Sequence, residues 1–286
     1  MRGLLLFLVA AVAWAQPQKT IFPSDSKDPK QSDGAALLEA VCPGRVVVGK
    51  GVQCQMKCPE FTGLSEFSGW TLLAVTRGHF LSPESDDAAL AMTGCEPHSE
   101  NWGGTILLTH RAQEWMMLWY KAGVETSQCH KVKLEDNREI LVCLGSDGGQ
   151  GLLWTQLYVE DLQAPRPALM AGENGFFGIF DSTETCGWMS DDISKPDPLI
   201  HAYIERVIFR DVRGSVAAIS ATAAYGERKM TRKDVDICTH QSRTKVPKTL
   251  DFLPPTKRHR IDFLFENGSY RLDPRTESAA RIFSRR

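Results

Sequence analysis

The chain has 286 residues, of which 42% are hydrophobic and 24% charged, and its formal net charge at pH 7 is −2. These values are ordinary for a folded globular protein, and they exclude a disordered chain, a collagen and a coiled coil. A chain of this length can build one large hydrophobic core or two smaller ones without help from a metal.

The N-terminus has the pattern of a secretory signal peptide. Arg2 supplies a positive charge, residues 4–12 form a short apolar run, and Ala13-Trp14-Ala15 is the small-x-small pattern that signal peptidase accepts. The apolar run is well short of the ~20 residues that cross a bilayer, so we expect no transmembrane span. The pattern predicts cleavage after Ala15 and a secreted or periplasmic protein.

The cysteines are expected to form disulfides, because an oxidising compartment favours four pairs over eight free thiols. Cys129 and Cys143 are the favoured pair, since only a short loop separates them. A zinc site would use Cys54, Cys58, Cys95 and His98, but this spacing is not that of a standard ribbon or finger, so no metal or other cofactor is expected. The full set is Cys42, Cys54, Cys58, Cys95, Cys129, Cys143, Cys186 and Cys238.

Residues 16–33 are polar and predict an extended lead-in or a flexible tether before a single β-rich domain over residues 34–286. If that domain has two halves, they should meet near residues 161–172. A short helix is expected over residues 34–41, capped by Asp33 and ended by Cys42-Pro43-Gly44.

Most of the remaining pattern predicts β-strands, since short runs of branched and aromatic residues alternate with Gly, Pro or Asp. Residues 85–92 follow Ser82-Pro83-Glu84 in the way that a capped helix begins, and residues 199–209 follow Asp197-Pro198 and have helical spacing. Each could be a helix or the turn of a strand–turn–strand pattern, and both possibilities stay open. Asn267-Gly268 predicts a tight hairpin. The expected strands are residues 45–48, 70–76, 105–109, 115–120, 140–144, 152–159, 176–180, 261–265 and 269–272.

The aromatic run over residues 115–120 would place Trp115, Met117 and Trp119 on one strand face. Met116, Leu118 and Tyr120 would lie on the other. Burial of both faces is expected, and the alternative is a sugar-stacking platform on one exposed face.

Three stretches share a rhythm of a small or aromatic residue, a polar loop, an acidic residue and a short apolar strand. They are residues 78–92, 134–142 and 209–219. This rhythm resembles FG-GAP repeats, also called integrin-like or VCBS repeats, of secreted β-propellers. The resemblance implies a mainly β fold that is an irregular or small β-propeller, with a β-sandwich with insertions as the alternative. Calcium binding is not implied, because residues 81–85 and 211–214 lack the alternating carboxylates that calcium requires.

Charge is unevenly distributed along the chain. Residues 16–199 carry 14 Lys plus Arg against 25 Asp plus Glu, whereas residues 200–286 carry 18 against 10, a net charge of +8. Arg228, Lys229, Arg232 and Lys233, with Lys257, Arg258 and Arg260, could form a patch for an anionic glycan, a lipid headgroup or an acidic protein. The favoured alternative is that the basic third packs against the acidic part of the same chain.

No standard catalytic motif is present: the sequence lacks a G-x-S-x-G elbow, an H-E-x-x-H helix, a Walker loop and a G-x-G-x-x-G turn. Two loops offer polar side chains for a ligand, although the favoured explanations are a disulfide-anchored surface loop for one and a glycine-rich hairpin for the other. The candidate ligand-binding residues are His98, Glu100 and Trp102 in one loop and Asp147 and Gln150 in the other.

These features favour a secreted, non-catalytic binding or interaction protein whose ligand is a protein or a glycan. No nucleic-acid partner is expected, and the oligomeric state is left open. The alternative is an extracytoplasmic hydrolase of glycan or ester substrates, with Asp87, Glu100 and Asp147 as the carboxylates to inspect.

Overall fold

The computed structural model describes residues 20–57, 68–95, 103–149, 152–163, 175–181, 198–212, 215–234, 255–266 and 268–283. Within them the chain is mainly β, with short helices α1 (Gly34–Glu39), η3 (Pro274–Thr276) and α3 (Glu277–Ala280). The predicted β-rich class with few short helices is therefore confirmed. No helix of the described part is long and apolar enough to span a membrane.

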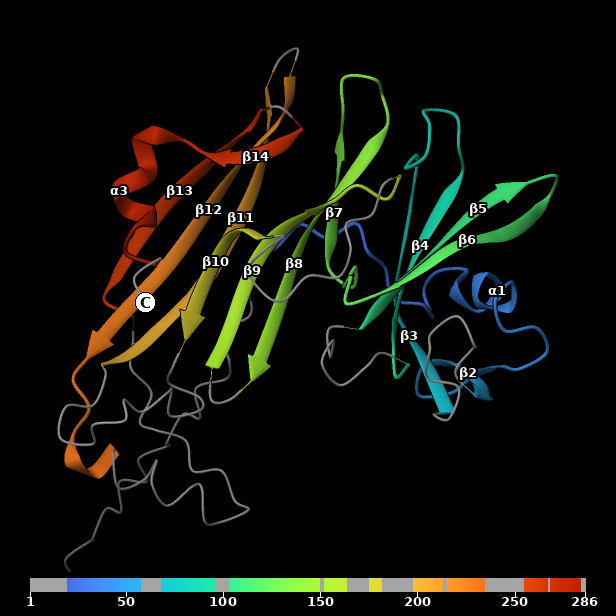
Figure 1. The fold of residues 1–286 in the computed structure, drawn as a ribbon, viewed down its shortest axis with the longest axis horizontal. Coiled ribbons are helices and arrows are strands. Elements are labelled where there is room, and N and C mark those ends of the chain that lie inside the picture. Colours follow the sequence, from blue (N-terminus) through green and yellow to red (C-terminus); the bar gives the residue numbers. More distant parts are fainter. Residues whose placement is uncertain are drawn as a thin grey trace, which may run out of the picture.

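The strands form three antiparallel sheets that follow one another in chain order along the long axis of the molecule (Figure 1). The first sheet holds β1 (Val46–Val48), β2 (Val52–Lys57), β3 (Ser68–Gly78), β4 (Asp87–Thr93), β5 (Gly104–Arg111) and β6 (Glu114–Ala122). The second holds β7 (Cys129–Lys133), β8 (Glu139–Gly149), β9 (Leu152–Glu160) and β10 (Gly175–Asp181). The third holds β11 (Leu199–Val212), β12 (Ser215–Arg228), β13 (Lys257–Glu266) and β14 (Ser269–Leu272).

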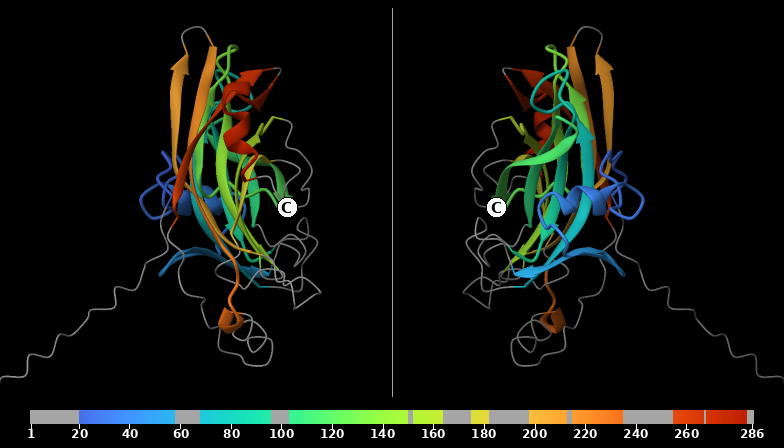
Figure 2. Two further views of the ribbon diagram at one scale, coloured as in Figure 1. Left: turned by 90° about the vertical axis from the view of Figure 1, so that its left-hand side faces the viewer. Right: turned by 90° about the vertical axis from the view of Figure 1, so that its right-hand side faces the viewer.

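The sheets are stacked as layers, and they overlap when the molecule is viewed along its long axis (Figure 2). The second sheet is buried on both faces because its side chains alternate between two cores. Ile140 and Val142 of β8 pack with Ile204 and Phe263 of the third sheet. Leu141, between them in the sequence, packs with Leu107 of the first sheet.

A third core lies on the other face of the first sheet, where Leu37 and Leu38 of α1 pack against Trp70 and Leu90. The end sheets therefore do not meet: α1 covers the outer face of the first, and the third has its own outer face. A propeller needs its first and last blades to pack on each other, and the sheets of the described residues do not close in this way.

All of the predicted strands are present, with small shifts of their ends, and the hairpin pairs Glu266 with Ser269. Both segments left open are strands: residues 85–92 lie mainly in β4 and residues 199–209 lie in β11. The three stretches that resemble FG-GAP repeats are each a hairpin, joining β3 to β4, β7 to β8 and β11 to β12.

The aromatic run in β6 differs from its expected arrangement. A β-bulge opposite Leu107 and Leu108 shifts the register, so Tyr120 rather than Trp119 joins Trp115 and Met117 against the third core, beside α1. Met116 and Leu118 are 49% and 39% exposed. Burial of both faces was therefore wrong for this edge strand, which has a neighbour on one side only.

The lead-in is extended over residues 20–28, where it is hydrogen-bonded to all three sheets. Its residues 20–27, here called the N-terminal strap, begin beside β11, where the Ile21 amide donates to the Glu205 carbonyl at 2.9 Å. The strap then crosses β7, where the Asp25 amide donates to the Cys129 carbonyl at 2.7 Å, and ends at β3, where Lys27 and Val75 form a β-bridge.

Two disulfides join described cysteines. Cys42–Cys54 ties the segment after α1 to β2, and Cys129–Cys143, the pair favoured from the sequence, joins directly opposed residues of β7 and β8. Cys95 is also disulfide-bonded. A zinc site with Cys54 and Cys95 is therefore wrong, because both sulfurs are committed to disulfides. Cys58, Cys186 and Cys238 lie outside the described residues.

Candidate functional site

The two loops proposed for ligand binding fall largely outside the described residues. His98, Glu100, Trp102 and Gln150 lie there, so their role stays a prediction. Asp147 belongs to β8, where its backbone lies opposite Trp154 of β9. A hairpin strand, rather than a phosphate-binding loop before a helix, therefore continues through this position.

The four residues singled out as a basic patch lie at the end of β12 and just after it. Arg228 is engaged by a neighbouring carboxylate: its two terminal nitrogens donate to the two oxygens of Asp234, at 2.6 and 3.0 Å. Lys229, Arg232 and Lys233 are exposed. Arg228 thus has a local structural role in the segment that follows β12.

Ion pairs do not join the basic third to the acidic part of the chain within the described residues. Arg210 and Arg260 pair with Asp262, and Arg258 pairs with Glu205, all inside the third sheet. The expected charge pairing between the two parts is therefore not seen where the structure describes both partners. The basic third instead presents its charge on a surface of its own.

That surface is the outer face of the third sheet. Residues directly opposite each other in an antiparallel sheet point to the same face, so the register defines rows across β11, β12 and β13. Arg206, Thr222 and Arg260 form one row, and Tyr203, Ala224 and Arg258 form the row beside it. On the other side lie Ile208, Ser220 and Asp262, followed by Arg210 and Ala218.

We call this surface the arginine face, defined by Arg206 and Arg210 on β11 and Arg258 and Arg260 on β13. The small side chains of β12 form a floor between the two pairs. Because neighbouring strands lie about 4.8 Å apart, the two columns of arginines stand roughly 10 Å apart. Long arginine stems can lie over such a floor while their guanidinium groups stay in water.

Two acidic residues hold three of these arginines in place. Asp262 accepts from Arg210 at 3.1 Å and from Arg260 at 3.0 Å, and the Ser220 hydroxyl donates to the same oxygen. Arg258 donates through Nε to both Glu205 oxygens at 3.0 Å. Bonds through Nε leave the terminal nitrogens of Arg258 and Arg260 available to a further acceptor.

The face is therefore a positively charged and partly fixed array. The side chains of Arg210, Arg258 and Arg260 are 44%, 54% and 60% exposed, and Asp262 is only 13% exposed beneath them. Arg206 is exposed as well. Guanidinium groups held in this way bind carboxylate, sulfate and phosphate oxygens in two-pronged fashion, which favours an anionic ligand with repeated charges.

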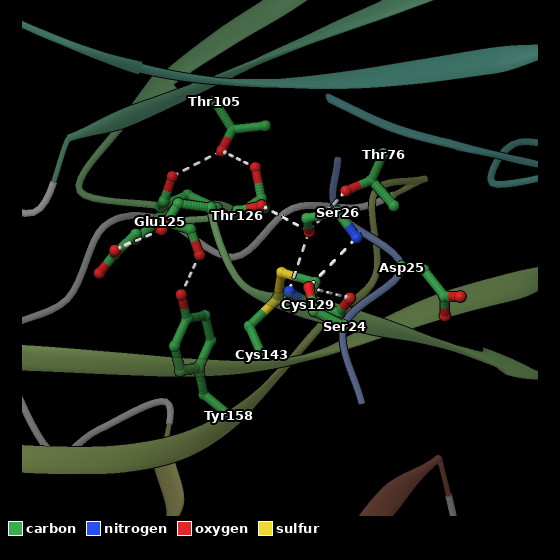
Figure 3. The surroundings of a disulfide bond; sticks show 12 residues. Ser24, Asp25, Ser26, Thr76, Thr105, Glu125, Thr126, Cys129, Cys143 and Tyr158 are labelled. Carbon is green, nitrogen blue, oxygen red and sulfur yellow. Dashed lines mark hydrogen bonds between the residues drawn. A yellow bond between two sulfur atoms is a disulfide. The ribbon is translucent and has the colours of Figure 1, made fainter. Parts of the chain in front are cut away.

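A second polar cluster surrounds the Cys129–Cys143 disulfide and is structural. Ser26 of the strap hydrogen-bonds the Thr76 hydroxyl at 2.8 Å and accepts from the Cys129 amide at 2.9 Å (Figure 3). On the other side of the disulfide, the Tyr158 hydroxyl donates to the Glu125 carbonyl. The two Ser26 bonds join the strap to the first and second sheets. All three bonds supply partners to polar groups that would otherwise be buried without a hydrogen bond.

Two of these groups have shifted pKa values. Burial raises the pKa of the Glu125 carboxyl, against an opposing hydrogen bond from the Ser127 hydroxyl. Burial, together with the charges of Glu125 and Glu160, raises the pKa of Tyr158 well above its ordinary value. Tyr158 therefore stays protonated and donates its hydrogen bond across the physiological range.

Asp87, one of the carboxylates named for a hydrolase, is a turn brace. Its side chain is fully buried and accepts from the amides of Phe80 and Leu81, both at 2.9 Å, and from the Ser85 hydroxyl at 2.5 Å. These contacts fix the connection between β3 and β4. The carboxylate is committed to its own loop, and no group of three or more potential metal ligands occurs among the described residues.

No family model, curated protein or solved structure matches this chain. The site therefore has to be judged on its own geometry. The sequence pointed to Arg258 and Arg260 but not to Arg206 and Arg210. Their alternation along β11 was the available signal, and only the strand register shows that they face the same floor.

Proposed function

We propose that this is a secreted, non-catalytic binding protein that attaches to an anionic polymer, such as a sulfated glycan, through the arginine face. The observation that carries the proposal is the array of four arginines on one sheet face around a floor of small residues. A repeating polyanion matches such an array, because its charges recur along the chain as the arginines recur along the strands.

Several features support an extracytoplasmic location for this activity. The N-terminal pattern is that of a signal peptide, and the described cysteines are in disulfides, which persist mainly in oxidising compartments. The stacking of the second sheet on the third, with a shared core, supports a β-sandwich type of scaffold that would keep the face rigid.

The hydrolase alternative has less support. Asp87 is engaged within its own turn, and Glu100 and the side chain of Asp147 lie outside the described residues. A catalytic pair of carboxylates needs a cleft in which both reach the substrate. The arginine face offers an open surface, which suits binding.

Retention on immobilised heparin tests the proposal with the mature, disulfide-bonded protein. The wild type should bind at low salt and elute as salt rises, because the Debye length falls to about 8 Å at physiological ionic strength. The double variant Arg206→Gln, Arg260→Gln should elute at clearly lower salt. Both side chains are exposed, so its melting temperature should change little.

The matched control removes two charges elsewhere. Arg45, just before β1, and Arg111, at the end of β5, are exposed at the first sheet, so Arg45→Gln, Arg111→Gln changes the net charge equally without touching the face. The control should elute with the wild type. Equal weakening of both double variants, or no retention of the wild type, would refute the proposal.

A further inference from the structure

A groove of about 650 Å³ opens between the second and third sheets, away from the arginine face. Its walls are formed by β7 of the second sheet and β11 of the third. Both are edge strands, because each has a hydrogen-bonded neighbour strand on one side only. Phe209, Val216 and Leu134 make its apolar part. Its volume falls within the range of about 300–1,000 Å³ that is usual for ligand sites.

The β7 edge exposes backbone groups to this groove. Along an antiparallel strand, alternate residues direct their N–H and C=O toward and away from the partner strand. The Leu134 amide bonds inward to the Arg138 carbonyl at 2.8 Å, whereas the Lys131 amide bonds outward to Asp25 at 2.8 Å. The backbone N–H and C=O of Lys133 therefore point away from β8, as those of Lys131 do. Neither group has a partner among the described residues.

The β11 edge is similar. The Val207 amide donates outward to the Ile21 carbonyl of the strap at 2.9 Å. Phe209, two residues later, faces the same way, and its backbone N–H and C=O likewise have no partner within the described part of the chain. Such open edges are templates for an added strand.

The N-terminal strap shows what kind of segment these edges accept. It is extended, and it bonds to β11 at Ile21 and to β7 at Asp25. The strap leaves the β11 edge near Phe209. There the Phe22 ring packs on the Phe209 ring, and the His130 ring stacks on the same ring with centroids 4.0 Å apart. The groove continues from that point along both strands toward their hairpin turns, with His130 and Phe209 in its wall.

We propose that this groove binds an extended peptide segment of a partner protein, which adds to the β7 edge at Lys133 and places an apolar side chain against Phe209 and Val216. Main-chain hydrogen bonds would give affinity, and the apolar part would give side-chain preference. The charged side chains of the groove lining are balanced, with Lys131 and Lys133 against Glu135 and Asp211. An extended peptide of low net charge fits this lining better than a polyanion, so the inference is independent of the arginine face.

Peptides selected from a displayed library of random peptides on the mature protein provide the probe, and their affinity is then measured by fluorescence polarisation. Lys133→Pro removes the outward N–H, and proline is tolerated on an edge strand. This variant should weaken binding about tenfold or more, since it removes a backbone hydrogen bond and obstructs the edge. Lys133→Ala is the matched control; it keeps the N–H and should bind within about twofold of the wild type.

A second variant guards against misfolding of the first. Ala217→Leu should fill part of the groove's apolar wall without adding charge, because Ala217 lines the groove from β12 and packs beside its core, and it should also weaken binding. Both variants should retain the wild-type melting profile and heparin retention. Equal loss in Lys133→Ala and Lys133→Pro would show attraction by charge and overturn the proposal. So would failure to select any peptide that distinguishes the wild type from Lys133→Pro, or a concentration-dependent dimer that Lys133→Pro abolishes.

Discussion

Arg228 and Asp234 form a two-pronged ion pair that closes the segment after β12, with the two bonds at 2.6 and 3.0 Å. Asp234 also accepts from the amide and the hydroxyl of Thr231, both at 2.7 Å. Its side chain is only 5% exposed, and these donors hold its pKa well below the ordinary value. A residue singled out for a surface patch therefore organises a turn.

This pairing predicts that the four basic residues of the segment are not equivalent. Arg228→Ser should lower the free energy of unfolding by about 1–2 kcal/mol, because a buried carboxylate loses its charged donor. Lys229→Ser with Arg232→Ser should leave stability within about 0.5 kcal/mol, since both are exposed. Denaturant unfolding of the two variants makes the comparison, and equal losses would contradict the structural role of Arg228.

The same pair predicts a pH dependence. A lowered pKa means that Asp234 contributes stability above its ordinary value of 3.8 and that this contribution is lost as the pH falls through the folded-state pKa. The difference in melting temperature between wild type and Arg228→Ser should therefore be full at pH 6 and shrink below about pH 4. A difference that is constant over this range would refute the assignment.

Glu125 should show the opposite dependence. Burial raises its pKa above the ordinary 4.5, so folding favours the protonated form, and its contribution to stability is lost as the pH rises through the folded-state pKa. Glu125→Gln, which can still accept the Ser127 bond, should therefore gain in melting temperature relative to wild type between pH 4 and pH 7. Thermal melts at both values decide this, and a gain that is the same at each would contradict it.

The disulfides predict that most of the cysteines are protected. In the mature protein, thiol titration under denaturant should find no more than two free thiols of the eight cysteines. Removing the Cys129–Cys143 bond, which spans 14 residues, should cost about 3 kcal/mol in the loop-entropy model. The double variant Cys129→Ser, Cys143→Ser measures that cost by denaturant unfolding. Four or more reactive thiols without reductant would overturn the disulfide framework.

The strap should contribute to stability through Asp25. Its carboxylate accepts from the Lys131 amide at 2.8 Å and lies 2.9 Å from the His130 ring nitrogen. Asp25→Ala should therefore lower the free energy of unfolding by about 1–2 kcal/mol. Glu84→Ala, an exposed acidic position in the turn before β4, is the control and should be nearly neutral. Equal stability of the two variants would argue against a structural role for the strap.

The strand content was predictable from residue patterns, whereas the ambiguity in β11 has a specific cause. A β-bulge between Ile204 and Arg206 inserts one residue, so the inward-facing Ile204 and Val207 are three positions apart, as on a helix. In β4 the cause differs: Ala89 packs toward one core and Leu90 toward another, so the strand has no polar face and no alternation.

The arginine face was only half predictable for a related reason. Arg206 and Arg260 are distant in the sequence. They lie in one row of the sheet only because each is opposite Thr222 of β12. Local patterns carry no information on strand register across such a separation, since register depends on turns, bulges and packing together. The groove depends on two edge strands from different sheets, which no sequence pattern joins.

The strap also sets the order in which this molecule can be completed. The Thr20 hydroxyl donates to the Ile204 carbonyl across a separation of 184 residues, so the earliest described residue finds its partner only after most of the chain has been synthesised. Contacts of such separation are slow to form, because a long loop must close before any bond repays it. The first segment can therefore be seated only after β11 has been synthesised. Until that step, the edges of β7 and β11 are open along the whole length that the strap later covers.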